Sequence, residues 1–431
     1  THPPAASEAL GDITRYPSYL YHYLLSFVYR GLSLLGFADT TKIILLRLLN
    51  SIIFGSSLFV FKEIFKKMHL SPTVINVSLL FFVLTPVVPF LAAHINYDNL
   101  LVPLSAVAVL LAIKLIECLQ KGKFPFVVTV ELLVTCFITS LVKFNFLPIF
   151  LAIGLVCLVE LIKTQKKQKI QFTEQLKTQL RATNRYVSVS IGVLLVLFMG
   201  LFVERYGVNI IKYHTPTPEC SQILSVASCS QYGPWARDNQ LKMAKTGDPE
   251  WGALRYSGHW LAQNMHELFF AIDQNYVETS PLPMPYYAGW VFGFTGLVLI
   301  VLYARRLKAM PYASLIAVIT MLYTAILWAD NFHRFNIVNW PVAIHGRYLL
   351  PILIFIYAAI AQSFFYALTG HSGKTARLLR LMFPALAIVC MLQGGIVTYV
   401  IRSNQNWYWT NAAVIRVNNG LRALLNFVVI K

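Results

Sequence analysis

Charged residues are scarce in this sequence, and acidic residues are the scarcest. Asp, Glu, Lys and Arg together make up 13% of the chain, against roughly 25% in soluble domains. Asp and Glu together number 18, against 36 Lys and Arg. The sequence also lacks a Walker loop, a dinucleotide-binding glycine fingerprint, an H-E-x-x-H motif and a G-x-S-x-G motif. The low charged fraction excludes an ordinary soluble domain. The missing motifs exclude the common soluble enzyme classes that depend on them.

Apolar residues make up 57% of the chain, and they come in blocks long enough to cross a bilayer. We therefore predict an all-α polytopic membrane protein with about ten transmembrane helices. The predicted spans are Thr41–Phe61, Thr73–Ala93, Asn99–Cys118, Phe126–Val142, Phe146–Ile162, Tyr186–Glu204, Tyr287–Ala304, Tyr312–Trp328, Tyr348–Leu368 and Phe383–Ile401.

The stretch Ser18–Gly36 has a mixed character that differs from these blocks. It is rich in tyrosine and is interrupted by His22 and Arg30. Such mixed polarity favours a helix lying in the membrane interface, and a further span is the alternative.

The short loops predict the orientation, because Lys and Arg collect on the cytoplasmic side. The basic loops "FKEIFKKMH", "QKGK", "KTQKKQKIQ", "ARRLK" and "GKTARLLR" all fall on one face, which we predict to be cytoplasmic. Membrane helices then occupy residues 41–204 and 287–401. Residues 1–40, a large loop at 205–286 and the segment 402–431 are external, so both termini face outward from the cytoplasmic (plasma) membrane. Topology and anionic membrane lipids account for the net charge of +18, and we expect no nucleic-acid partner.

The chain begins with Thr1, although its first residues are predicted to be external. We expect that an upstream first helix is missing, which would give about eleven helices in the full protein. A removed signal sequence is the alternative.

Two of the six cysteines, Cys220 and Cys229, lie nine residues apart in the large external loop. Their closeness in an oxidising compartment predicts a disulfide, with free thiols as the alternative. No Cys/His pattern of zinc spacing lies nearby, and we expect neither a metal nor a cofactor.

Polar residues interrupt the apolar sequence at two predicted outer turns. The first, "AAHINYDNLLVPL", contains His94 and Asp98, and a helix cap is the simpler interpretation of Asp98. The second, "TSLVKFNFLPIF", contains Lys143, which would either face a lipid phosphate or extend to the interface as a membrane anchor.

A third polar cluster occurs in "WADNFHRFNIVNWPVAIHGRYLLP", which carries Arg334, His345, Arg347 and Tyr348. The arginine guanidinium is a planar fork suited to phosphate oxygens, and Gly346 allows close approach of the backbone. The alternative is an aromatic belt in which Arg347 is only an anchor.

Four stretches, in their order along the chain, resemble a largely uncharacterised family of bacterial membrane glycosyltransferases of the GT-C type. They are "RYPSYLYHYLLSFVYRGLSLLG", "NYDNLLVPLSAVAVLLAIKL", "LVKFNFLPIFLAIGL" and "GRYLLP". The resemblance extends from about Arg15 to Ile401. It implies an enzyme that moves a sugar from a polyprenyl-phosphate carrier to an acceptor on the external face.

The resemblance also suggests roles for individual residues. Asp98 matches an acidic, catalytic position, whereas Lys143 and Arg347 match phosphate-binding positions. Further candidates are Arg334 for phosphate, and His94, His345 and Tyr348 for the substrate. Glu8 and Asp12, the only carboxylates before Arg15, are candidates for the acidic residue of the family's first external loop, which commonly serves as the base. Three features depart from the family: the first external loop is truncated, Tyr97 stands where Pro is frequent, and the loop around Cys220 has no counterpart.

Two non-enzymatic functions compete with the glycosyltransferase. One is a structural subunit of a membrane complex, which implies a protein partner. The other is a lipid or polysaccharide transporter. Transporters commonly have related halves and charged residues near the bilayer midplane, whereas here ionisable residues gather at helix ends and no repeat is detected. The sequence therefore favours the enzyme.

Overall fold

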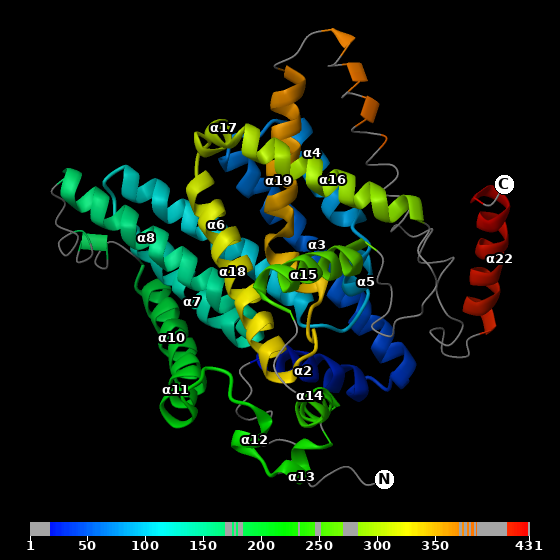
Figure 1. The fold of residues 1–431 in the computed structure, drawn as a ribbon. Helices are drawn as coiled ribbons and strands as arrows, with labels where there is room; N and C mark the ends of the chain where they lie inside the picture. The colour runs from blue at the N-terminus through cyan, green and yellow to red at the C-terminus, as the bar shows by residue number, and fades with distance from the viewer. Residues whose placement is uncertain are drawn as a thin grey trace. The chain divides into compact units, whose positions relative to one another are not determined.

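The computed structural model consists of helices joined by turns, and no strand occurs in the part of the chain that it describes (Figure 1). That part comprises residues 18–168, 175, 178–179, 184–231, 233–245, 251–269, 283–369, 373–374, 377–378, 381–382, 385 and 412–429. The chain divides into two compact units. Unit 1 is Thr1–His69, His94–Ala253 and Pro311–Ala343, and unit 2 is Leu70–Ala93, Leu254–Met310 and Ile344–Lys431.

In unit 1, helix α6 (Asp98–Gln120) contacts α3 (Asp39–Lys67), α7 (Phe126–Val142) and α8 (Leu147–Gln168), as Figure 1 shows. Small buried residues along α6, such as Ala108 and Ala112, let neighbouring helices approach closely. The other elements of unit 1 are α2 (Leu20–Leu34), η1 (Phe144–Phe146), α10 (Arg185–Phe202), η2 (Val203–Gly207), α11 (Val208–Tyr213), α12 (Cys220–Ile223), α13 (Val226–Cys229), α14 (Gly233–Ala244) and α18 (Ala313–Val338).

Unit 2 is organised around α19 (Leu350–Thr369), which packs against α4 (Pro72–Leu84) and α16 (Pro283–Leu302). The short turn η3 (Gly346–Leu349) precedes α19 and contacts α5 (Val87–Ala92). The remaining elements of unit 2 are α15 (Ala253–Phe269, apart from its first residue), α17 (Ala304–Lys308) and α22 (Ala412–Val429).

Six helical stretches of the described residues are long and apolar enough to cross a membrane. They are Asp39–Lys67, Asp98–Gln120, Phe144–Lys167, Tyr186–Tyr213, Ala313–Val338 and Gly346–Thr369, and the shorter apolar helices are Pro72–Leu84, Phe126–Val142 and Trp290–Leu302. The first nine predicted blocks overlap these helices, which confirms an all-α, multi-pass membrane protein. The tenth, Phe383–Ile401, lies outside the described residues apart from Ala385. A total of about ten spans therefore stays a prediction.

Two predicted spans differ in detail from the observed helices. The second is interrupted at Thr85 and Pro86, where the Thr85 hydroxyl donates to the Phe81 carbonyl and also contacts the Tyr357 hydroxyl. The sixth continues past Glu204, its predicted end, through the π-helical turn η2 to Tyr213. Such a turn carries one extra residue and so redirects the side chains that follow it.

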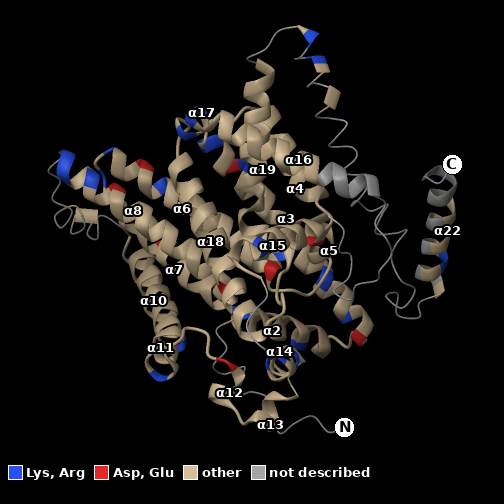
Figure 2. Cartoon of the chain, in the orientation of Figure 1, with Lys and Arg blue, Asp and Glu red and all other residues tan. Residues whose placement is uncertain are grey.

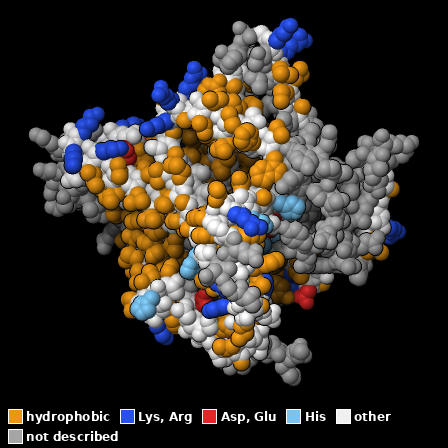
Figure 3. Space-filling view, in the orientation of Figure 1, with side chains coloured by type: hydrophobic (Ala, Val, Ile, Leu, Met, Phe, Trp, Pro, Cys, Tyr) orange, Lys and Arg blue, Asp and Glu red, His pale blue; other side chains and the backbone are white. Residues whose placement is uncertain are grey.

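Apolar side chains cover the exposed faces of several helices, as expected for contact with lipid. Figure 3 shows hydrophobic side chains gathered over α10, whose exposed apolar residues include Val187, Val189, Val193, Val196 and Leu197. Helix α2 also exposes apolar residues, including Tyr23, Leu24 and Phe27. With 15 residues it is shorter than the roughly 20 needed to span a bilayer, which agrees with an interfacial helix.

Basic residues lie at the helix ends that we predict to be cytoplasmic. Lys166 and Lys167 occupy the last turn of α8, and Arg305, Arg306 and Lys308 lie on α17 (Figure 2). In the predicted external loop, Cys220 and Cys229 form a disulfide that joins α12 to α13, with their Cα atoms 5.8 Å apart. The predicted disulfide is therefore confirmed.

The predicted orientation leads to a labelling experiment in sealed cells. A membrane-impermeant maleimide should label Met243→Cys, an exposed position in the large external loop, and should leave Lys167→Cys unlabelled until the cells are opened. Labelling of Lys167→Cys in intact cells would show that the orientation is reversed.

Candidate functional site

The predicted site residues are divided between the two units. Asp98, Lys143, His94 and Arg334 belong to unit 1, whereas His345, Arg347 and Tyr348 belong to unit 2. The candidates Glu8 and Asp12 lie outside the described residues. Each unit is therefore described with its own candidate residues.

In unit 1, Asp98 and Lys143 form a buried ion pair. Asp98 is the first residue of α6, and Lys143 directly follows the last residue of α7. The Lys143 Nζ lies 2.7 Å from Asp98 Oδ1, and the two side chains are only 3% and 1% exposed. The ammonium also lies 4.4 Å from the centre of the Tyr97 ring. Two residues predicted to serve catalysis and phosphate binding are thus each other's partners.

This pairing bears on both predicted roles. Because Lys143 is buried against a carboxylate, its charge is neutralised locally rather than presented to a ligand. Asp98 retains one oxygen, Oδ2, with no hydrogen-bond partner among the described residues. The pair therefore has a geometry suited to holding the start of α6 against the end of α7. Its catalytic and phosphate-binding roles stay predictions.

A hydrogen-bond network adjoins the pair at the start of α6. The Asn99 amide donates to the His94 carbonyl at 2.6 Å and to Asn50 Oδ1 at 3.2 Å. Tyr21 of α2 also donates to Asn50 Oδ1, at 2.6 Å. Burial raises the pKa of Tyr21, so its hydroxyl stays protonated and remains a donor. Helix α2 is thereby joined to the same polar centre.

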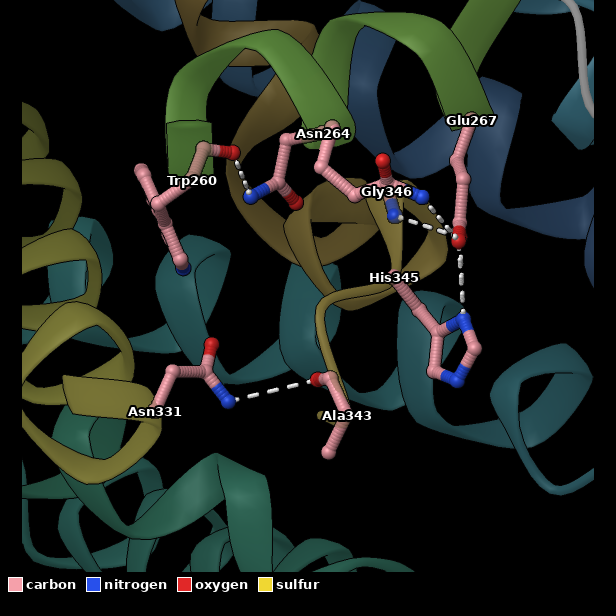
Figure 4. Close-up of polar contacts among 8 residues, drawn as sticks. Trp260, Asn264, Glu267, Asn331, Ala343, His345 and Gly346 are labelled. Atoms are coloured by element: carbon pink, nitrogen blue, oxygen red, sulfur yellow. Dashed lines mark hydrogen bonds and ion pairs between the residues drawn. The ribbon is translucent and has the colours of Figure 1, made fainter. Parts of the chain in front are cut away.

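The other unit 1 candidate, Arg334, lies on an exposed part of α18. Its Nε is 3.3 Å from Asp330 Oδ2, one helical turn away. At the end of the same helix, Asn331 donates to the Ala343 carbonyl at 3.2 Å (Figure 4). Arg334 does not join the Asp98 cluster through any described contact, and its phosphate role is untested.

In unit 2, a carboxylate that sequence reasoning missed organises the turn before α19. Glu267, near the end of α15, approaches His345 Nδ1 with Oε2 at 2.9 Å and Oε1 at 3.2 Å. Its Oε2 also accepts the backbone N–H of Gly346 at 3.2 Å (Figure 4). Since a carboxylate only accepts hydrogen bonds, the interaction places the proton of His345 on Nδ1. Glu267 is the only acidic residue of α15, and this isolated carboxylate was the feature of the sequence that could have indicated the site.

Glycine is required at position 346 because the turn lies directly against α15. A Cβ atom there would be 2.8 Å from the Asn264 carbonyl oxygen and 2.8 Å from the Leu268 backbone nitrogen. Both obstacles are backbone atoms, so they cannot rotate away as the end of a side chain could. Gly346 thus permits the close packing that brings His345 to Glu267.

The predicted neighbours of His345 are close to it. Its ring contacts Tyr348 edge-on with centroids 5.5 Å apart, and the Arg347 guanidinium lies 5.4 Å from the centre of the same Tyr348 ring. Three residues of the predicted cluster, His345, Arg347 and Tyr348, therefore lie within one turn, whereas the fourth, Arg334, lies on α18 of unit 1. Among the described residues, no three His, Cys, Asp or Glu side chains are grouped so that they could hold a metal ion.

The fold defines a multi-pass, all-α membrane protein in which each unit contains some of the candidate residues. No protein-family model, curated protein or solved structure matches this chain.

The buried pair in unit 1 predicts an asymmetric effect on stability. Lys143→Met should lower the free energy of unfolding by about 3–5 kcal/mol, because it leaves the Asp98 charge buried without its counter-ion. The double variant Asp98→Asn/Lys143→Met should recover most of that loss. Chemical denaturation in detergent micelles, followed by tryptophan fluorescence, measures both. Lys66→Met, which breaks the exposed pair with Glu63, should have a much smaller effect because solvent screens that pair.

The close approach at Gly346 predicts a second effect on stability. Gly346→Ala should destabilise unit 2 by about 1–3 kcal/mol through overpacking. Gly154→Ala is the matched control, because a Cβ there meets nothing within 4 Å and alanine is the better helix former. Equal stabilities of the two variants in the same denaturation assay would contradict the packing argument.

Proposed function

We propose that this chain is a GT-C type glycosyltransferase of the cytoplasmic membrane that moves a sugar from a polyprenyl-phosphate carrier to an external acceptor. The observation that carries the proposal is the turn His345–Tyr348. It combines a carboxylate-bound imidazole and a guanidinium at the start of an apolar, membrane-length helix. A lipid phosphate suits this combination, because it is negatively charged and lies at the membrane surface, where the end of a membrane-spanning helix is expected.

The proposed chemistry requires few groups. A sugar leaves its carrier as the anomeric carbon–oxygen bond breaks, and negative charge then develops on the phosphate. A nearby guanidinium stabilises that charge with paired N–H donors, which is the role proposed for Arg347. The acceptor hydroxyl must lose its proton in the same process, so a base is also required.

The membrane context supports a lipid-linked substrate. Exposed apolar faces, such as that of α10, suit contact with membrane lipids, and a polyprenyl chain would lie in the same hydrocarbon layer. The basic loops predict that the start of α19 faces outward. Arg347 would then be at the level of the outer phosphate groups.

One observation favours a second candidate function, a non-catalytic structural subunit. Asp98 and Lys143, two of the residues that match the glycosyltransferase family, are buried against each other rather than presented to a substrate. In an enzyme this pair would position the outer ends of α6 and α7. In a structural subunit it would stabilise the helix bundle and do nothing else.

Binding of polyprenyl phosphate to purified protein tests the proposed role of Arg347. Arg347→Lys should weaken binding by about 1–3 kcal/mol, because an ammonium retains the charge but loses the paired donors of the guanidinium. Arg347→Ala should weaken it at least as much. Isothermal titration in detergent with a short-chain polyprenyl phosphate measures the difference.

Arg305→Lys is the matched control, since Arg305 lies on α17 at the predicted cytoplasmic side and should leave binding unchanged. If both Arg347 variants bind as tightly as the parent protein, Arg347 is a membrane anchor. Binding without any sugar transfer would favour the structural subunit.

A further inference from the structure

The contact between Glu267 and His345 fixes the orientation of the imidazole in the turn before α19. Both carboxylate oxygens lie within hydrogen-bonding distance of Nδ1, at 2.9 and 3.2 Å. With its proton on Nδ1, a neutral imidazole carries its basic lone pair on Nε2. Figure 4 shows this second nitrogen on the side of the ring that faces away from Glu267.

The two side chains differ in their access to solvent. Glu267 is 14% exposed, whereas His345 is 30% exposed. The carboxylate is thus mostly enclosed behind the imidazole, with a further hydrogen bond from the Gly346 backbone holding it in place. The half-buried imidazole is the member of the pair that a substrate can reach.

We infer that His345 is the general base that accepts the proton of the acceptor hydroxyl, and that Glu267 is its positioning residue. This inference rests on the proposed glycosyltransferase function and deepens it. Glu267 sets which nitrogen is basic and stabilises the imidazolium that forms, as a carboxylate does in other histidine-based catalytic pairs.

The geometry favours His345 over Asp98 as this base. Asp98 Oδ1 is occupied by the Lys143 ammonium at 2.7 Å, and its side chain is only 1% exposed. His345 is more accessible and lies two residues from Arg347 within one turn. The base and the cation for the departing phosphate therefore come from one short stretch of chain.

In the proposed step, the acceptor oxygen forms a bond to the anomeric carbon as its proton passes to His345 Nε2. The bond between the anomeric carbon and the carrier's phosphate oxygen breaks, and its electron pair remains on that oxygen. Polyprenyl phosphate leaves beside Arg347. The imidazolium then returns its proton to water, so the step needs no oxidant, reductant or further reactant.

Substitutions at His345, Glu267 and His266 test the inference in the full-length protein. His345→Gln should lower the transfer rate by about 10²–10⁴-fold, the usual contribution of a general base. Glu267→Gln should lower it by about tenfold or more, because the amide oxygen accepts the N–H without stabilising the positive ring. His266→Gln, which removes a neighbouring imidazole on α15, should leave the rate within about twofold of the parent, a change too small to reflect lost catalysis.

The transfer assay uses polyprenyl-phosphate-linked glucose, mannose, galactose and N-acetylglucosamine, each labelled in the sugar, with isolated cell envelopes as the acceptor. Binding of unlabelled polyprenyl phosphate is measured on the same variants and should be unchanged in His345→Gln and Glu267→Gln. Added imidazole should restore part of the transfer rate of His345→Ala, because it can replace the missing side chain as a base. Imidazole would not restore the rate of a variant that is inactive because it is misfolded.

The outcomes separate the two proposals. An active parent whose His345→Gln variant transfers sugar at the parental rate would overturn the role of His345 and leave the glycosyltransferase function standing. Loss of transfer together with loss of polyprenyl phosphate binding, and with no rescue by imidazole, would make the contact structural. A parent protein that transfers none of the four sugars overturns the proposed function, and the inference falls with it.

Discussion

The bilayer interior offers no hydrogen-bonding partners, and most of this structure follows from that constraint. Each backbone N–H and carbonyl must be satisfied within the chain, which makes helices the economical solution for a single chain crossing lipid. At two irregular turns of the described residues, a side-chain hydroxyl adds a hydrogen bond to a backbone carbonyl. At the break before α5, Thr85 donates to the Phe81 carbonyl. Within η2, the Tyr206 hydroxyl donates to the Ser140 carbonyl of α7.

The same constraint determines where charge is found. An isolated charge in an apolar interior is costly, whereas a paired charge with further polar neighbours is tolerated. Asp98 and Lys143 meet this condition at the ends of α6 and α7, beside the Tyr97 ring and the Asn99 network. Their mutual burial explains why two ionisable residues coexist with so apolar a helix bundle.

The turn before α19 shows how a small residue can create a chemical site. Gly346 allows the chain to lie against the backbone of α15, and that contact brings His345 to Glu267. With any larger residue, α15 and the turn would be forced apart. The orientation of the imidazole is therefore a consequence of backbone packing as well as of hydrogen bonding.

The sequence by itself determined the all-α membrane class, the first nine apolar blocks, the Cys220–Cys229 disulfide and the local cluster of His345, Arg347 and Tyr348. These features depend on apolar runs or on residues close together in the chain, which a linear pattern records directly. Only the tertiary structure decided that Asp98 pairs with Lys143, 45 residues away, and that Glu267 holds His345 across 78 residues. Helix packing creates such contacts. No local sequence pattern specifies which distant carboxylate the Lys143 ammonium or the His345 imidazole will contact.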